Sequence, residues 1–111
     1  MGFLSVIGQC LFHERKYDEA IKIFENILQI DSKNISALNS LARTHNEKNE
    51  KGKAEEYFLK ALKIDGSSFY LLNNIAGFYR ENSSYAKAID YYKQALSVNP
   101  NNAYIYNNLA K

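Results

Sequence analysis

Histidine and cysteine are the residue types that most often hold metals or act in catalysis, and this chain contains few of them. It has two histidines, His13 and His45, and one cysteine, Cys10. Neither histidine has a second ligand at a metal-binding spacing. His45 falls on the apolar face of a predicted helix, so we expect a buried, hydrogen-bonded histidine. Cys10 has no basic cluster or predicted helix start beside it, so we expect a buried, inert thiol.

The sequence also lacks the common catalytic motifs. No serine has a histidine and a carboxylate at a recognisable spacing. The five glycines are isolated from one another, so none forms a phosphate-binding loop. Acidic pairs such as Asp18-Glu19 open predicted helices, where carboxylates favour the positive end of the helix dipole. We therefore expect no enzymatic activity, no metal and no cofactor.

Asparagines recur at a spacing of 34 residues and indicate a binding surface. They form two columns that share this spacing: Asn39, Asn73 and Asn107, and beside them Asn74 and Asn108. Asparagine is unfavourable inside a helix because its side chain competes for the backbone. An amide both donates and accepts hydrogen bonds, so a row of amides can bind the backbone of an extended peptide. The same asparagines could instead link neighbouring helices, and the sequence leaves both roles open.

The asparagine spacing belongs to a repeat that covers the whole chain. Alanines recur at the same period as Ala20, Ala54 and Ala88, and an aromatic residue follows each of them four places later. The repeat divides the chain into units 1–34, 35–68 and 69–102 and a partial unit 103–111. Because no register slip interrupts the pattern, we expect one domain spanning residues 1–111.

Each unit contains two apolar patterns with a period of 3.6 residues, which predicts two helices per unit. Polar segments separate the helices within a unit at 14–16, 48–52 and 81–84, and separate the units at 31–34, 65–68 and 99–102. The sequence therefore predicts an all-α fold with seven helices, the last one short. Small residues such as Gly8 and Ala54 should let the two backbones of a pair approach closely.

This pattern resembles the tetratricopeptide repeat (TPR) family along the whole chain. The third unit, residues 69–102, carries the family's signature residues Leu72, Ile75, Ala76, Tyr79, Ala88, Tyr92, Ala95 and Pro100. The second unit departs from the pattern by having His45 at the place of the signature tyrosine. The resemblance implies a right-handed superhelical solenoid of antiparallel helix pairs. It also implies a concave groove lined by the first helices, with protein or peptide ligands.

One face of each first helix is not used by the apolar pattern, and we call it the groove stripe. In the first unit it contains Gly2, Ser5, Val6, Gln9, Phe12 and His13; in the second it contains Ser36, Asn39, Ser40, Arg43, Asn46 and Glu47. Glu47 stands one turn after Arg43 and can pair with it. Tyrosines at Tyr70 and Tyr104 would add aromatic contact area. The candidate peptide-binding residues are Gln9, Asn39, Ser40, Arg43, Tyr70, Asn73, Asn74, Arg80, Tyr104, Asn107 and Asn108.

The groove stripe argues against one sub-type of the family. Some members bind the C-terminal carboxylate of chaperones with lysines, asparagines and an arginine on their first helices. The matching places in this chain hold Ser5, Gln9, Ser40, Tyr70 and Asn74. Because the basic residues are missing, a charged chaperone tail is disfavoured as the ligand.

Charge and composition narrow the possible partners further. The net charge is +2 and the lysines are spread along the chain, which argues against nucleic-acid or membrane binding. A single cysteine suits a reducing compartment, so we expect a cytoplasmic protein. The leading hypothesis is a protein–protein interaction module that binds a peptide or partner segment. The alternative is a structural or self-assembling repeat segment of a larger protein, which forms homo-oligomers through the uncapped C-terminal end, near Tyr106 and Leu109.

Overall fold

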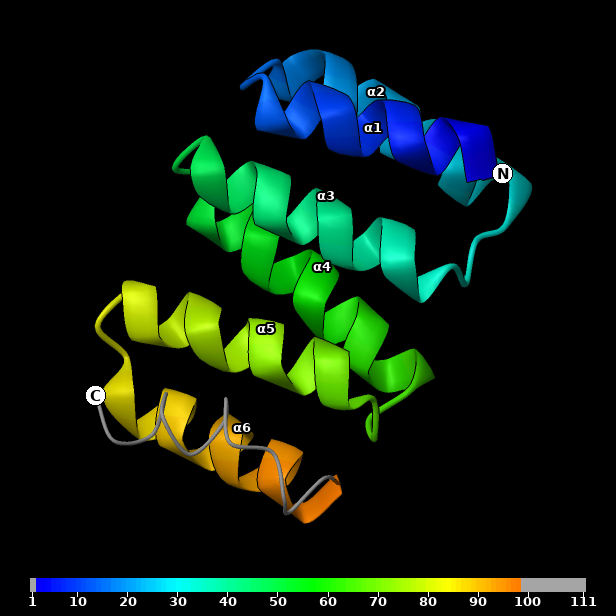
Figure 1. Ribbon diagram of the computed structural model, residues 1–111. Coiled ribbons are helices and arrows are strands. Elements are labelled where there is room, and N and C mark those ends of the chain that lie inside the picture. Colours follow the sequence, from blue (N-terminus) through cyan, green and yellow to red (C-terminus); the bar gives the residue numbers. More distant parts are fainter. Residues whose placement is uncertain (1, 99–111) are drawn as a thin grey trace. The chain divides into compact units, whose positions relative to one another are not determined.

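The computed structural model describes residues 2–98, which form six α-helices and no β-strand. The helices are α1 (Gly2–His13), α2 (Tyr17–Ile30), α3 (Ile35–Glu47), α4 (Lys51–Ile64), α5 (Phe69–Glu81) and α6 (Tyr85–Val98) (Figure 1). This confirms the predicted all-α fold of paired helices. The predicted seventh helix, at 103–111, lies outside the described residues. None of the described helices has both the length and the apolar character needed to cross a membrane.

The chain forms two compact units. Unit 1 is Met1–Ile64 and contains α1 to α4, and unit 2 is Asp65–Lys111 and contains α5 and α6. The single domain over residues 1–111 and the superhelix remain predictions, because both concern how the units are arranged. Each unit is described by itself below.

The turn inside each helix pair has the same geometry in all three repeats. Its middle residue adopts a left-handed conformation, with φ of 65° at Arg15, 67° at Asn49 and 64° at Ser83. The next residue donates its amide back into the preceding helix, as in the 2.9 Å bond from Lys16 N to Leu11 O. This bond satisfies a carbonyl at the helix end, as in a Schellman motif. The repeat therefore fixes a sharp turn without a glycine at its centre.

A side-chain cap begins α3 and α5 at matching places. The Oδ1 atom of Asn34 accepts a hydrogen bond of 2.9 Å from the amide of Ala37. The Oγ atom of Ser68 accepts one of 3.3 Å from the amide of Leu71. Such caps satisfy amides that have no partner within the helix. They explain why both first helices begin directly after the polar segments between units.

Two of the predicted turns within units are shorter than expected. Lys51 and Gly52 begin α4, and Glu81 ends α5, although the sequence pattern places all three in turns. The left-handed residue reverses the chain within three residues. The polar residues on either side can therefore remain helical.

The core of unit 1 lies where α2 packs against α3. Ala20, Phe24 and Ile27 of α2 form one buried cluster with Ala37 and Leu41 of α3. Gly8 of α1 lies against the ring of Phe24, because a Cβ atom at Gly8 would be 2.6 Å from the Cε1 atom of that ring. The absence of a side chain at Gly8 therefore lets the aromatic ring fill the space between α1 and α2.

The other two helix pairs use alanine where α1 uses Gly8. Ala42 of α3 and Ala76 of α5 stand at the place of Gly8 and are fully buried, and so is Ala54 of α4, which stands at the place of Ala20. The aromatic residues Phe58 and Tyr92 are also buried, in α4 and α6 respectively. The burial of these residues agrees with the prediction that small residues let the two helices of a pair approach closely.

One face of α1 is exposed, although its counterpart on α3 is buried. The side chains of Phe3 and Ile7 are 88% and 47% exposed, whereas Ala37 and Leu41, at the same places one repeat later, are 3% and 0% exposed. Cys10 on the same face is exposed, so the expectation of a buried thiol was wrong. The reason is that α2 packs on this face of α3, while no described helix of unit 1 covers the matching face of α1.

Candidate functional site

Unit 1 brings the groove stripes of two consecutive repeats together. The Nε2 atom of Gln9, on α1, donates a hydrogen bond of 3.0 Å to the Oγ atom of Ser40 on α3. Thr44 supports Ser40 from one turn later, because its Oγ1 atom donates to the Ser40 carbonyl at 2.7 Å. Gln9 and Ser40, both predicted from sequence as site residues, thus form one neutral polar pair across two helices, in which Gln9 is partly exposed and Ser40 is buried. We call this the Gln9–Ser40 pair.

Arg43 is held by an aromatic ring from the neighbouring helix. Its guanidinium carbon lies 5.1 Å from the centre of the Phe12 ring, a cation–π distance. Phe12 also meets Tyr17 edge to face, with ring centres 5.7 Å apart. The predicted ion pair with Glu47 is absent among the described contacts, since Arg43 turns to the ring of Phe12 instead. The guanidinium therefore lies on the same stripe as the Gln9–Ser40 pair.

Asn39, another candidate residue, is buried. Its side chain is 1% exposed and makes contacts inside the protein. This burial favours the packing role for Asn39 over direct peptide contact. We therefore leave it out of the surface proposed below.

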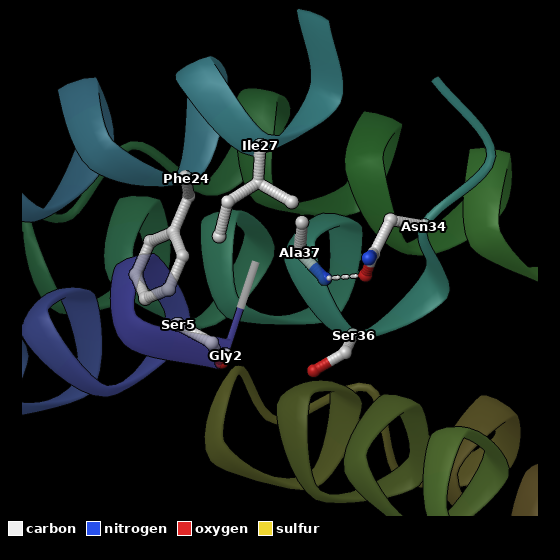
Figure 2. Close-up of a pocket in the computed structure, with 7 residues that line it drawn as sticks. All are labelled: Gly2, Ser5, Phe24, Ile27, Asn34, Ser36 and Ala37. Carbon is white, nitrogen blue, oxygen red and sulfur yellow. Dashed lines mark hydrogen bonds between the residues drawn. The ribbon is translucent and has the colours of Figure 1, made fainter. Parts of the chain in front are cut away.

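A pocket opens where α1, α2 and α3 meet, and its lining includes Ser5 and Ser36, four residues before Gln9 and Ser40 in the sequence (Figure 2). Its volume is about 200 Å³. The buried side chains of Phe24, Ile27 and Ala37 form its apolar floor. Its rim contains Gly2, Ser5, Asn34 and Ser36. Three of these rim residues, Gly2, Ser5 and Ser36, belong to the predicted groove stripe.

Sequence reasoning missed the other members of the pocket. Phe24 and Ile27 follow the apolar pattern of the second helix of the first repeat, so the sequence predicts core residues at both places. Asn34 stands directly before a predicted helix, which is the usual signal of a cap. Only the run of small residues at Gly2, Ser5 and Ser36 could have indicated an open space here.

The candidate residues of unit 2 lie on α5. Tyr70 is 58% exposed, whereas Asn73, Asn74 and Arg80 are partly buried. The Oδ1 atom of Asn73 is buried and has no hydrogen-bond partner within residues 2–98. Such an acceptor is unusual and calls for an explanation. The remaining candidates, Tyr104, Asn107 and Asn108, lie outside the described residues, as does the C-terminal end predicted to self-associate.

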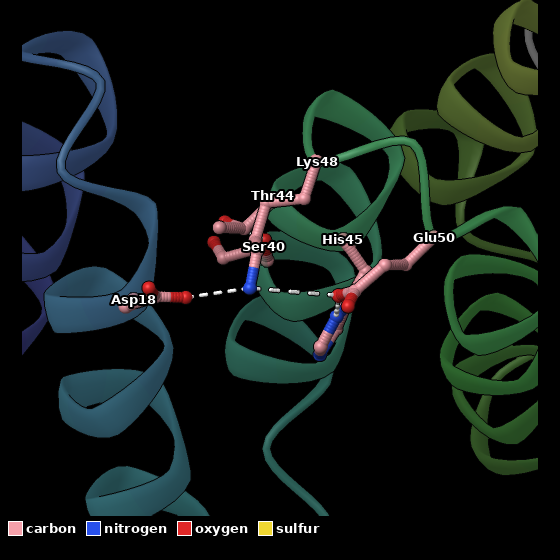
Figure 3. A network of polar contacts seen from close by, with 6 residues as sticks. All are labelled: Asp18, Ser40, Thr44, His45, Lys48 and Glu50. Atoms are coloured by element: carbon pink, nitrogen blue, oxygen red, sulfur yellow. Dashed lines mark hydrogen bonds and ion pairs between the residues drawn. The ribbon is translucent and has the colours of Figure 1, made fainter.

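A polar network joins the turn after α3 to its neighbours in unit 1 (Figure 3). The Nδ1 atom of His45 donates to the Oε1 atom of Glu50 at 2.7 Å. Lys48 lies between two carboxylates, 2.5 Å from Asp18 Oδ1 and 3.8 Å from Glu50 Oε1. The hydrogen bond from His45 lowers the pKa of Glu50 below its ordinary value of 4.5. The hydrogen bond from Lys48 likewise lowers the pKa of Asp18.

This network is structural in character. His45 is 5% exposed, and its ring stacks on Tyr57 with centres 5.5 Å apart and planes 9° apart. Tyr79 and Tyr91, the same pair of places one repeat later, stack in the same way at 5.6 Å and 10°. The expectation that His45 is a satisfied core histidine is therefore confirmed. Within residues 2–98 no group of three His, Cys, Asp or Glu side chains is placed to hold a metal ion.

The chain matches known family models in two places. The tetratricopeptide repeat model matches residues 3–67, and a second TPR repeat model matches residues 78–111. No curated protein sequence matches the chain.

Solved structures show the same fold. The first TPR of Spaghetti (RPAP3), bound to the HSP90 peptide SRMEEVD, has a TM-score of 0.84 at 22% identity, over 97% of this chain and 86% of that one. The first TPR domain of human RPAP3 has a TM-score of 0.86 at 22% identity, over 96% of this chain and 84% of that one. The Pseudomonas aeruginosa protein pilF has a TM-score of 0.88 at 24% identity, over 97% of this chain and 50% of that one.

The family assignment rests on sequence and structure together. The first match alone covers more than half of the chain. The helix pairs, their shared turns and the buried alanines follow the repeat period of the sequence within the described residues. This protein belongs to the tetratricopeptide repeat family.

Proposed function

We propose that the α1–α3 face of unit 1 binds an extended, largely uncharged peptide segment of a partner protein, and that the protein acts by binding and not by catalysis. Tetratricopeptide repeats generally serve as protein-interaction modules. The observation that carries the proposal is the Gln9–Ser40 pair, because its hydrogen bond joins predicted groove residues of two repeats.

The chemistry of this surface suits a peptide backbone. In the Gln9–Ser40 pair, Gln9 retains its Oε1 acceptor and a second amide hydrogen. Both groups can pair with the amide and carbonyl of an extended chain whatever its side chains are. Arg43, fixed over Phe12, adds a planar group that can donate several hydrogen bonds to carbonyl oxygens.

The same surface is poorly suited to an acidic tail. The peptide SRMEEVD bound to the first TPR of Spaghetti is rich in carboxylates. In this chain, the unit 1 places that match the tail-binding lysines and asparagines of that sub-type are Ser5, Gln9 and Ser40, and none of them carries a positive charge. A likeness in fold at 22% identity therefore does not transfer that ligand to this protein.

An array of immobilised peptides, followed by calorimetry on the strongest binder, tests the proposal. We expect peptides with few charges to bind and SRMEEVD not to bind. Replacing both Gln9 and Arg43 with alanine should weaken binding by about two- to tenfold for each hydrogen bond lost, with little change in melting temperature. The matched control is Gln29→Ala, an exposed glutamine on α2, which should leave binding unchanged.

Two results would refute the proposal. One is a clear preference for SRMEEVD over uncharged peptides. The other is an equal loss of folding and binding in the Gln9/Arg43 variant, which would show that these residues serve packing alone.

A further inference from the structure

The pocket between α1, α2 and α3 has the chemistry of a side-chain subsite. Its floor is apolar and comes from three helix residues: Phe24 and Ile27 on α2, and Ala37 on α3. These three are 1%, 2% and 3% exposed, so they belong to the packed core of unit 1. An apolar group entering the pocket would rest on a surface that the fold already holds in place.

The volume of the pocket sets the size of its occupant. Ligand pockets for whole small molecules usually measure about 300–1,000 Å³. A dry engineered cavity of about 150 Å³ holds one benzene molecule. At about 200 Å³, this pocket matches a single branched aliphatic or aromatic side chain.

The rim supplies polar groups around that apolar floor. The Oδ1 atom of Asn34 accepts from the amide of Ala37, and the side-chain nitrogen of Asn34 carries two hydrogens that can be donated to a ligand. The hydroxyl groups of Ser5 and Ser36 stand on α1 and α3, and Figure 2 shows both beside the opening. These groups can bind the backbone amide and carbonyl on either side of an inserted side chain.

The position of the pocket matches the spacing of an extended peptide. Ser5 and Ser36 each stand four residues before a member of the Gln9–Ser40 pair. Four residues of helix rise about 6 Å. In an extended chain, alternate side chains on one face are about 6.6–6.8 Å apart. One side chain in the pocket would thus place the residue two positions away over the Gln9–Ser40 pair.

We propose that this pocket is a specificity subsite that accepts one leucine- or phenylalanine-sized side chain of a bound peptide. The inference rests on the proposed function, and it adds what that function lacks: an apolar anchor two residues from the part of the backbone held by Gln9. Neutral backbone contacts alone accept any sequence, so the pocket supplies the preference.

N-acetyl-leucinamide tests the pocket without any partner protein. Added to the ¹⁵N-labelled protein, it should shift the backbone amide signals of Ser5, Ser36 and Ala37, with a dissociation constant on the order of 10 mM. N-acetyl-alaninamide should bind at least several-fold more weakly. No shift at these amides with the leucine compound, or equal shifts with both compounds, would overturn the inference.

Variants whose new side chain fills the pocket, which we call filling variants, provide a second test. Ser5→Leu and Ser36→Leu place a side chain in the opening and should abolish the shifts. Gln29→Leu adds a leucine at an exposed place on α2 and should leave them unchanged. Unchanged ¹⁵N spectra outside the pocket show that a filling variant is folded. Persistent binding in both folded filling variants would overturn the inference.

The peptide measurements separate this inference from the proposed function. For the strongest array peptide, replacing its apolar anchor with alanine should weaken binding at least tenfold to the native protein and less than twofold to Ser36→Leu. If Gln9 and Arg43 contribute to binding but the anchor preference survives in Ser36→Leu, the subsite is wrong and the function stands. If N-acetyl-leucinamide binds the pocket but no peptide binds, the function fails, and with it the pocket's role as a peptide subsite.

Discussion

Replacing Gly8 with alanine directly tests how α1 packs on the core of unit 1. A Cβ atom at Gly8 would lie 2.6 Å from Cε1 and 2.7 Å from Cζ of Phe24. The ring of Phe24 is 1% exposed and packs against Ile27 and Leu41, so it has little room to move. Either the ring or the backbone of α1 must shift to admit the methyl group.

Two opposing effects decide the result. Alanine is favoured over glycine inside a helix by about 1 kcal/mol. Overpacking a closely packed core usually costs about 1–3 kcal/mol. The net expectation is a loss of unfolding free energy of up to about 2 kcal/mol. In contrast, a Cβ atom at Gly77 in α5 would meet only the Tyr92 hydroxyl, at 3.9 Å. Gly77→Ala should therefore show the gain of about 1 kcal/mol without the loss.

Urea denaturation followed by circular dichroism measures both variants. The difference between Gly8→Ala and Gly77→Ala isolates the overpacking and should be about 1–3 kcal/mol. In a Phe24→Leu background the ring atoms are gone, so Gly8→Ala should lose most of its penalty. If Gly8→Ala stabilises the native protein as much as Gly77→Ala does, the contact between α1 and Phe24 is wrong. A penalty that persists without the ring would place its cause elsewhere in α1.

Three further predictions follow from the burial, charge and capping of single residues. Leu41→Ala should lower the free energy of unfolding by about 2–5 kcal/mol, because Leu41 is fully buried. Ile7→Ala, at the matching exposed place, should lower it by about 1 kcal/mol or less. Equal losses in denaturation would contradict the burial pattern. The lowered pKa of Glu50 means that its contribution is fully present above its ordinary value of 4.5 and is lost as the pH falls through the lower folded value. Glu50→Gln should therefore weaken the acid dependence of stability below about pH 5, and an unchanged pH profile would refute this. Ser68→Ala should cost about 0.5–2 kcal/mol by removing the cap of α5, and no change in melting temperature would show that the cap is not needed.

The fold was predictable because the sequence repeats the same pattern of apolar and polar residues in each unit. A period of 3.6 residues places apolar side chains on one face of each helix, and the longer repeat period copies the whole helix pair. The burial of His45 followed from its place on that face. The hydrogen bond from His45 to Glu50 could not be predicted. It depends on the left-handed conformation of Asn49, and left-handed turns are usually recognised in a sequence by a glycine.

The candidate site was predictable only in part. The groove stripe included Gln9 and Ser40, which are hydrogen-bonded to each other, but Ser40 and Asn39 are both buried. Adjacent residues on a helix are about 100° apart, so a stripe drawn from sequence alone has uncertain edges. The pocket depends on three helices meeting, and Phe24 and Ile27 serve both its floor and the core. The apolar periodicity of the sequence predicts that such residues are buried, but it does not predict an unfilled space beside them.

Cys10 shows how the same repeat position acquires different surroundings. Cys10 is exposed on α1, whereas Thr44, at the same place one repeat later on α3, is 0% exposed in the helix that α2 covers. The pattern marks both faces as packing faces, but a neighbouring helix decides whether the packing occurs. A thiol reagent should therefore modify Cys10 rapidly in the native protein. In a Cys10→Ser background, Thr44→Cys should react only as fast as the protein opens, and urea should remove the difference. Equal rates in the two folded proteins would mean that α2 does not protect α3 at this position.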